Sequence, residues 1–339
     1  MRYQNVYVAG VASWLPPALT TAEALDDGYC PPDVAEDSGI ESVTIAVDAA
    51  PRLATRAAQK ALSRAGNPQI QLLLHATSTY QGHVRWTAAG FVQRLAVGTH
   101  NPITTLNVDG LGNGAMSSLE LAAGFMAGGA AQGALLTAAD RHGEPAYDRW
   151  RSDPGTPLGD GGGAMVLSST GGWARVLGTM TWSEAELEGM SRGDDPFLAA
   201  PTRPHPVDLD TRQRAFIARL GAPNVERLVT KARRSALQGV LAEAGLTTLD
   251  IDWFVLPGLG RRRLEEGYYK ALGIDPERTT WRWSRLTGSL GAADQFAGLD
   301  ALATSGRLRP GDKCLLMGEG GTSWTCALIE VISPYAGEA

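Results

Sequence analysis

The sequence predicts an α/β fold built from two similar halves. Strand-like and helix-like segments alternate along its 339 residues, which is typical of α/β chains. The second half repeats the first at a constant spacing, because Leu119 lies as far from Leu299 as Leu135 lies from Leu315. A repeat this long indicates a duplicated domain rather than a solenoid. The length also exceeds that of one ordinary core, which favours two fused units.

Hydrophobic periodicity and glycine stops predict the elements of the first half. PRLATRAAQKALSRAG, residues 51–66, has the apolar spacing of a helix and ends in glycine, and IQLLLHATST predicts a buried strand. His75 closes the apolar run of that strand, where we expect a hydrogen-bonded structural histidine rather than a ligand. The other expected elements are strands at 6–14, 134–140 and 159–169 and a small-residue helix at 117–129.

The second half repeats this plan with a helix at 229–246, a strand within IDWFVLPGLG, a small-residue helix at 288–306 and a final segment, MGEGGTSWTCALIEV, that mirrors GDGGGAMVLSS. Helices rich in alanine and glycine can be buried on all sides. We place the two halves at residues 1–170 and 225–339.

Two irregular segments interrupt this pattern. Residues 171–224 form a connection or lid rich in proline, glycine and charge, with one short helix at TRQRAFIARL. Residues 20–42 form a second, acidic excursion. Each could cover a pocket or be a plain surface loop.

Composition excludes several classes of function. The net charge of −6 and pI of about 5.5 argue against a nucleic-acid or acidic-membrane partner. No apolar run is long enough to span a membrane, and MRYQNVYVAG lacks a signal-peptide pattern. Cys30, Cys314 and Cys326 have no metal-ligand spacing and are expected to be small core residues in a reducing compartment. We therefore expect a cytoplasmic protein without a metal or a bound cofactor.

The stretch NVDGLGNGAMSSLELAAGFM, residues 107–126, looks like the start of an active-site helix. A glycine-rich turn feeds the helix, and a nucleophile would sit at that turn. The turn contains no cysteine, and its only serines, Ser117 and Ser118, come a turn or more into the helix.

Four stretches together carry a family resemblance: TSTYQGHVRW, GNGAMSSLELAAG, TAADRHGEPAYDRWRSDPGTPLGDGGGAMVLS and GSLGAADQFAGL. With the duplication, they resemble the thiolase superfamily over nearly the whole chain. More closely, the chain is similar to the β-ketoacyl-ACP synthase III-like proteins of natural-product biosynthesis. The resemblance implies a five-layered αβαβα sandwich and a homodimer, with an acyl-CoA or phosphopantetheine thioester as substrate and an acyl carrier protein as an alternative partner.

In that family, a thiolate at a helix N-terminus takes the acyl group, and backbone N–H groups bind the oxyanion. A histidine and a second polar residue assist with proton transfer. By the resemblance, the nucleophile falls at Gly112 and the histidine at Gly258, next to Leu259 in LPGLG. The assisting position falls at Ser289, and Asp294 is the candidate polar group that looks retained.

Glycine at both positions removes the covalent nucleophile and the imidazole, and leaves room where relatives hold side chains. The main-chain donors at Gly112, Asn113 and Gly114 would survive and could still polarise a carbonyl. Ser117 is an alternative nucleophile, although a serine that packs the helix is the simpler interpretation. Asp294 is either an acid–base group or a first-turn acid that complements the helix dipole.

Four further side chains are candidates for substrate binding. Trp86 and His83 follow a strand end, where α/β proteins place ligands. Arg149 could meet the phosphates of CoA or an acidic carrier protein, or it could be a solvated loop arginine. Arg261 opens the run RRR beside the predicted tunnel, which is a candidate docking patch for an acidic partner.

Three functions remain open at this point. The first is an acyl-thioester enzyme of a specialised-metabolite pathway that works without an acyl-cysteine. The second is a noncatalytic partner, comparable to a chain-length-factor subunit, in a heterodimer with a cysteine-bearing homologue. The third is a protein that only binds a thioester or a pathway product.

Overall fold

The computed structural model describes residues 1–197 and 206–335. Their main sheet has nine strands in the order β5-β4-β6-β7-β1-β8-β11-β10-β9. The strands of this sheet are β1 (Tyr7–Trp14), β4 (Leu72–Thr77), β5 (Thr104–Asp109), β6 (Gly133–Asp140), β7 (Gly161–Ser168), β8 (Ala174–Ser183), β9 (Trp253–Val255), β10 (Lys313–Gly320) and β11 (Ser323–Val331).

The sheet consists of two halves with one topology. In the first, β4 is parallel to β6, β6 is antiparallel to β7, and β7 is antiparallel to β1. In the second, β9, β10, β11 and β8 repeat these three pairings in the same order. Even the parallel partner of β4, strand β5, has a remnant in the second half, where Phe254 and Thr279 form an isolated parallel bridge. The halves join where β1 pairs briefly with β8.

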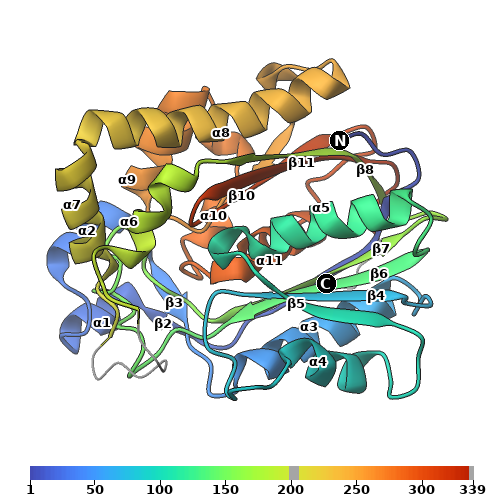
Figure 1. Ribbon diagram of the computed structural model, residues 1–339, viewed down its shortest axis with the longest axis horizontal. Coiled ribbons are helices and arrows are strands. Elements are labelled where there is room, and N and C mark those ends of the chain that lie inside the picture. The colour runs from blue at the N-terminus through green and yellow to red at the C-terminus, as the bar shows by residue number, and fades with distance from the viewer. Residues whose placement is uncertain (198–205, 336–339) are drawn as a thin grey trace.

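Helices separate and cover the two halves of the sheet (Figure 1). Between the halves lie helices α5 (Gly114–Ala127) and α11 (Asp294–Thr304). The outer face of the first half is covered by α3 (Ala50–Arg64) and α4 (Ala88–Ala96). The outer face of the second half is covered by α8 (Ala222–Ala244). The predicted αβαβα order of layers is therefore confirmed.

The middle layer explains the small residues of its helices. Nine of the eleven residues of α11 are buried, including Asp294 and Gln295. A β-carbon on Gly163 of β7 would lie 2.9 Å from the Cβ of Phe296, so glycine allows the strand and the helix to approach closely. Burial on two faces therefore selects alanine and glycine rather than an amphipathic pattern.

Many of the remaining elements lie at one end of the molecule (Figure 1). The excursion at 20–42 packs Cys30, Val34 and Trp150 into a small core. The other helices and strands are β2 (Ala18–Thr20), α1 (Thr21–Asp26), α2 (Pro32–Ser38), β3 (Ser42–Thr44), α6 (Gly189–Arg192), α7 (Leu209–Leu220), α9 (Arg261–Leu264), the π-helix η4 (Glu265–Lys270) and α10 (Trp281–Ser284). Among those at this end of the molecule are β2, β3, α1, α2, α6 and α7. Short 3-10 turns are η1 (Leu111–Asn113), η2 (Ala185–Glu188), η3 (Thr248–Asp250), η5 (Pro276–Arg278) and η6 (Gly291–Ala293).

The segment expected to connect the halves, 171–224, contains more structure than its composition suggests. Strand β8 lies inside it and pairs with β11 along its whole length. The short helix expected at 211–220 is confirmed as part of α7. Residues 198–205, which include part of APTRPHPVD, lie outside the described residues. The boundaries of the halves stay a prediction.

Two expectations about buried groups are confirmed. Both ring nitrogens of His75 are hydrogen-bonded, Nδ1 to the Thr137 hydroxyl at 2.9 Å and Nε2 to Gln81 Oε1 at 3.1 Å. The three cysteines are free and buried. Among the helices of the described chain, none combines the length and the apolar character that a membrane span requires.

Candidate active site at two facing glycine turns

Two equivalent turns meet in the middle layer. Turn η1 leads into α5 and turn η6 leads into α11, and Leu111 and Gly291 hold corresponding positions of the repeat. Both have left-handed backbone conformations, with φ of 48° and 61°. A β-carbon on Gly114 would lie 3.6 Å from the Cβ of Ala292, so the two helix starts touch. Leu111 has a side chain, so its conformation is strained, and such strain is typical of functional turns.

Gly112 has no room for a side chain. A β-carbon there would lie 2.6 Å from the main-chain oxygen of Glu319, closer than nonbonded atoms pack. The contact is with backbone, which cannot rotate away. A cysteine at 112 would therefore require the turn or strand β10 to shift.

Gly258 is closed in the same way, by the side chain of Asp294 and the main chain of Ser289. It follows β9 and is buried, as is Leu259. A β-carbon on Gly258 would lie 2.6 Å from Asp294 Oδ1 and 2.9 Å from Ser289 Cα. The extra room that two glycines were expected to leave is therefore absent at the β-carbon positions, because neighbouring atoms occupy it.

Asp294 bridges the two loops rather than capping its own helix. Its carboxylate accepts hydrogen bonds from the Gly258 N–H at 2.9 Å, the Leu290 N–H at 2.7 Å and the Ser289 hydroxyl at 3.2 Å. Burial raises the pKa of Asp294 to about 6, and these three hydrogen bonds oppose the rise. A carboxyl group with this pKa can exchange protons near neutral pH.

Two of the three predicted main-chain donors are already engaged. The Asn113 N–H donates to the Gly110 carbonyl at 3.0 Å, and the Gly114 N–H donates to the Leu111 carbonyl. The Gly112 N–H has no backbone acceptor within the part of the chain that the structure describes. Of the three predicted donors, the Gly112 N–H is therefore the one left for a substrate oxygen.

Ser117 lies in a polar network instead of at the turn. The Asn113 Nδ2 lies 2.9–3.1 Å from the hydroxyl oxygens of Ser117, Ser323 and Thr325, which share its two hydrogens. Asn113 Oδ1 is buried and has no partner among the described residues. These contacts favour a packing role for Ser117 over that of a nucleophile.

Asp140 ties the first half to turn η6. Its buried carboxylate accepts from the backbone and side chains of the loop after β4 and from the Ala292 N–H, at 2.7–2.9 Å. Burial disfavours its charge, but His142 and the hydrogen bonds from Ala292 and Ser78 outweigh burial and lower the pKa of Asp140. Asp140 is therefore a charged anchor at the start of α11.

The predicted phosphate contact at Arg149 is an internal ion pair. Both guanidinium nitrogens bond the carboxylate of the fully buried Asp160, at 2.8 and 2.7 Å. The geometry is that of a bidentate pair, and only 14% of the Arg149 side chain is exposed. Arg149 is thus neither a solvated arginine nor a free phosphate ligand.

Trp86 and His83 lie in the exposed loop after β4. Their rings meet edge to face, with centroids 5.5 Å apart, and Trp86 also contacts Phe91 at 5.8 Å. Trp86 is 37% exposed. The two side chains form a surface aromatic pair, and their predicted role in a pocket wall stays a prediction.

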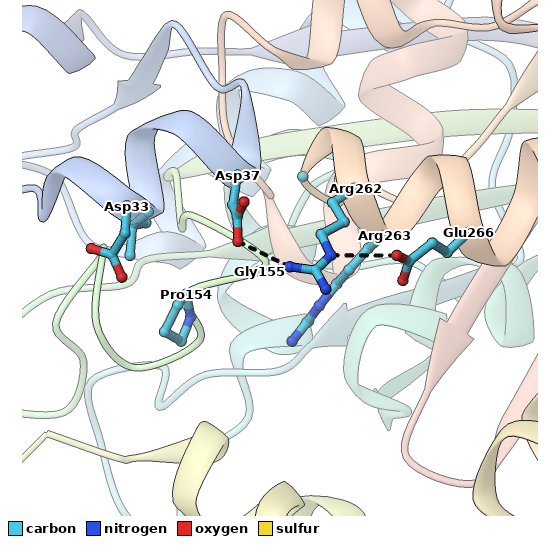
Figure 2. Close-up of a pocket in the computed structure, with 9 residues that line it drawn as sticks. Asp33, Asp37, Pro154, Gly155, Arg262, Arg263 and Glu266 are labelled. Carbon is cyan, nitrogen blue, oxygen red and sulfur yellow. Dashed lines mark hydrogen bonds and ion pairs between the residues drawn. The ribbon is translucent and has the colours of Figure 1, made fainter. Parts of the chain in front are cut away.

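A cavity of about 300 Å³ opens between α2 and α9 beside Gly260 (Figure 2). Arg262 spans it, with ion pairs to Asp37 at 3.2 Å and to Glu266 at 3.3 Å. Arg263 pairs with Asp153, and Arg261 donates to the Glu36 carbonyl. Two of the three arginines, Arg262 and Arg263, are therefore paired with acidic side chains, and Arg261 bonds a main-chain carbonyl.

Two features of this region lie outside the residues that the sequence analysis selected. Glu319 is held by Arg233, Tyr268 and Trp324 directly behind Gly112. His142 lies two residues beyond β6, and its position after a strand end was the available signal. The described residues contain no cluster of His, Cys, Asp and Glu side chains that could hold a metal ion.

Comparison with known proteins agrees with this architecture. Residues 107–184 match the family model described as 3-oxoacyl-[acyl-carrier-protein (ACP)] synthase III, and residues 241–331 match the model of its C-terminal part. The β-ketoacyl-[acyl-carrier-protein] synthase III of Hyphomonas neptunium is 29% identical over 96% of this chain and 98% of its own.

Solved structures give the same result. ChlB3, described as an acyltransferase, is 32% identical and superposes with a TM-score of 0.92 over 99% of this chain and 100% of its own. OleA of Xanthomonas campestris, at 21% identity and a TM-score of 0.76 over 97% of this chain and 100% of its own, shares the fold. These matches define a thiolase-fold protein of the acyltransferase class. Within that class, the chain belongs to the β-ketoacyl-ACP synthase III-like family.

Proposed function

We propose that this protein acts on an acyl-CoA or acyl-carrier-protein thioester of a specialised-metabolite pathway, and transfers or rearranges the acyl group without an acyl-cysteine. One observation carries the proposal: at Gly112, where the resemblance places the family's thiol, the Glu319 carbonyl oxygen lies 2.6 Å from where a β-carbon would be. A covalent intermediate at that turn would need a side chain that the backbone cannot accommodate.

The cysteines of the chain do not replace the missing nucleophile. Burial raises the pKa of Cys30 to about 11 and raises the pKa of Cys314 and Cys326 further. The thiolate is the reactive form of cysteine, so none of the three supplies a nucleophile near neutral pH. This supports direct transfer from the thioester to the acceptor.

Asp294 is the acid–base group of the proposed reaction. It lies where the two loops meet, with the Ser289 hydroxyl at 3.2 Å, and its pKa of about 6 suits proton exchange at neutral pH. The Gly112 N–H is the remaining main-chain donor for the thioester oxygen. Sites that keep such donors without a nucleophile can still accelerate acyl transfer by about 10³–10⁴ over water.

The test is turnover by the purified protein alone. Release of CoA from acetyl-, malonyl- and benzoyl-CoA is followed with a thiol reagent, and acyl-carrier-protein thioesters are tested by mass spectrometry. We expect turnover that falls at least tenfold in Asp294→Asn. If Asp294→Asn keeps full turnover and only melts at a different temperature, the carboxylate is structural and the assignment of Asp294 fails.

A noncatalytic partner subunit is the second candidate, and one surface favours it. Strand β5 is the edge of the sheet, and Leu106 on it is 54% exposed. On the neighbouring helix α5, Leu121 and Phe125 are 57% and 40% exposed. An unpaired edge strand flanked by apolar side chains is suited to pairing with another chain, either a second copy or a homologue that carries the cysteine.

Co-expression separates the two candidates. A protein that is inert alone and purifies only with a cysteine-bearing homologue supports the partner role and excludes the enzyme. A protein that turns over a thioester by itself excludes the purely structural partner.

A further inference from the structure

The resemblance places the family's histidine at Gly258, and a histidine elsewhere in the chain, His142, lies near Asp140, which bonds turn η6. His142 lies just past the end of β6, and only 3% of it is exposed. Its Nδ1 lies 2.7 Å from the Gly159 carbonyl oxygen. Its Nε2 has no hydrogen-bond partner among the residues that the structure describes. His75, by contrast, uses both ring nitrogens in structural hydrogen bonds.

The contact with Gly159 fixes the tautomer of His142. A carbonyl oxygen only accepts hydrogen bonds, so Nδ1 must carry the proton. The neutral ring then presents a lone pair on Nε2. Nε2 is not among the fully buried polar atoms that lack a partner in the described residues, so this nitrogen keeps access to solvent and is available to an incoming group. Backbone carbonyls orient the imidazoles of acid–base sites in this way.

His142 is connected to the loop that carries Ser289. The Gly159 carbonyl accepts from His142, while the Gly159 N–H donates to the Ser289 carbonyl at 2.8 Å. The Ser289 hydroxyl in turn donates to Asp294. On the other side of His142, Asp140 accepts from the Ala292 N–H in turn η6. The strand end that positions His142 therefore also positions the start of α11.

Two carboxylates and one aromatic ring lie close to His142. Asp160 accepts its backbone N–H at 2.7 Å and holds Arg149, and Asp140 is an ionised carboxylate nearby. The ring edge of Tyr147 packs against it with centroids 5.2 Å apart. Proton uptake at Nε2 would thus occur beside two carboxylates, neither of which blocks that nitrogen.

We propose that His142 is a second acid–base group of this site, the base that takes the proton of the acyl acceptor. This inference rests on the proposed thioester chemistry. The acceptor heteroatom forms a bond to the thioester carbon as its proton passes to Nε2. The carbon–sulfur bond breaks, and the leaving thiolate takes the proton of the Asp294 carboxylic acid. His142 then returns its proton to Asp294 through solvent, so the net products are the acylated acceptor and the free thiol.

His142→Asn tests the assignment. The asparagine amide nitrogen takes the place of Nδ1 and can keep the bond to Gly159, while Nε2 is lost. His100→Asn, on an exposed histidine, is the matched control. With acetyl-CoA and water as acceptor, we expect kcat to fall at least about 100-fold in His142→Asn, with KM and Tm near those of the unsubstituted protein. Unchanged kcat in a folded variant overturns the proposal.

A spectroscopic readout separates failure of this inference from failure of the proposed function. If the unsubstituted protein releases no CoA from any thioester, the proposed function fails, and the ring is examined directly. In ¹⁵N-histidine-labelled protein, His142 is expected to have an unprotonated Nε2 whose resonance shifts when acetyl-CoA is added. The same readout applies if His142→Asn does not fold. A protonated Nε2, or no shift up to millimolar acetyl-CoA, overturns the proposal.

Discussion

The carboxylate of Asp294 occupies the space in which a side chain at Gly258 would begin. Asp294 Oδ1 lies 2.6 Å from the position of a β-carbon on Gly258, and Asp294 Oδ2 accepts the Gly258 N–H at 2.9 Å. The glycine and the buried acid therefore depend on each other. The acid can reach the Gly258 amide only because residue 258 has no side chain.

Gly258→Ala is expected to destabilise the fold. The new methyl group meets Asp294 and the main chain of Ser289, and overpacking of this kind costs about 1–3 kcal/mol. The control is Gly124→Ala in α5, where a β-carbon meets no atom within 4 Å and alanine suits the helix. Urea unfolding measures both. Equal stability of the two variants would show that the space at 258 is open.

Gly112→Cys is not expected to restore a covalent site. The β-carbon meets the Glu319 carbonyl, so the turn must deform and stability falls by about 1–3 kcal/mol. Thermal melting measures the stability of the variant, and labelling with an acyl-CoA shows whether its cysteine is acylated. A variant that is as stable as the unsubstituted protein and carries an acyl group on Cys would contradict the closed geometry of the turn.

Because of Asp294, the stability of the protein should fall as the pH rises from 4 to 6. Its pKa of about 6 in the fold exceeds that of an unfolded aspartate, so the folded state favours the protonated acid. The stabilisation that the protonated Asp294 gives to the fold is fully present below the pKa of aspartate in the unfolded chain. It is lost as the pH rises through about 6. The difference amounts to about 3 kcal/mol.

Asp294→Asn removes this titration. We expect this from the free energies of unfolding measured in urea at pH 4, 5, 6 and 7. As the pH rises, the free energy of unfolding of the variant should increase relative to that of the unsubstituted protein. A difference between the two that is constant over this range would mean that the carboxyl group titrates normally.

Arg149→Ala should act on stability rather than on substrate affinity. The substitution leaves Asp160 buried without its bidentate partner, and breaking such a pair costs about 3–5 kcal/mol. Arg151→Ala, whose side chain is 51% exposed, should change stability by less than about 1 kcal/mol. Denaturation and CoA titration distinguish the roles. Loss of CoA affinity at full stability would restore the phosphate-binding interpretation.

The repeated pattern of apolar segments predicted most of the layers but not every strand. Helices α3 and α8 have clear helical periodicity and end at or just before a glycine, and strand β6 is a continuous buried run. Strand β5 is an exposed edge, and its burial pattern is unlike that of a core strand. Strand β8 follows a Gly-Gly pair in a segment whose later half is rich in proline and charge. Their pairing partners, distant in sequence, decide their structure.

The candidate site was predictable in position but not in geometry. Sequence order located Gly112, Gly258 and Asp294 at turns. The closure of the two glycines depends on Glu319 and Asp294, which reach them only in the folded chain. Arg149 looked like a loop cation because its partner Asp160 lies in a turn that suggested no ion pair.

The absence of an acyl-enzyme is the central claim, and intact-protein mass spectrometry tests it most directly. The purified protein is incubated with a panel of acyl-CoAs, quenched in acid and weighed, with a cysteine-bearing relative as the positive control. The account predicts an unchanged mass while CoA is released. A stable acyl adduct on any residue of this chain, removed by a later acceptor, would contradict it.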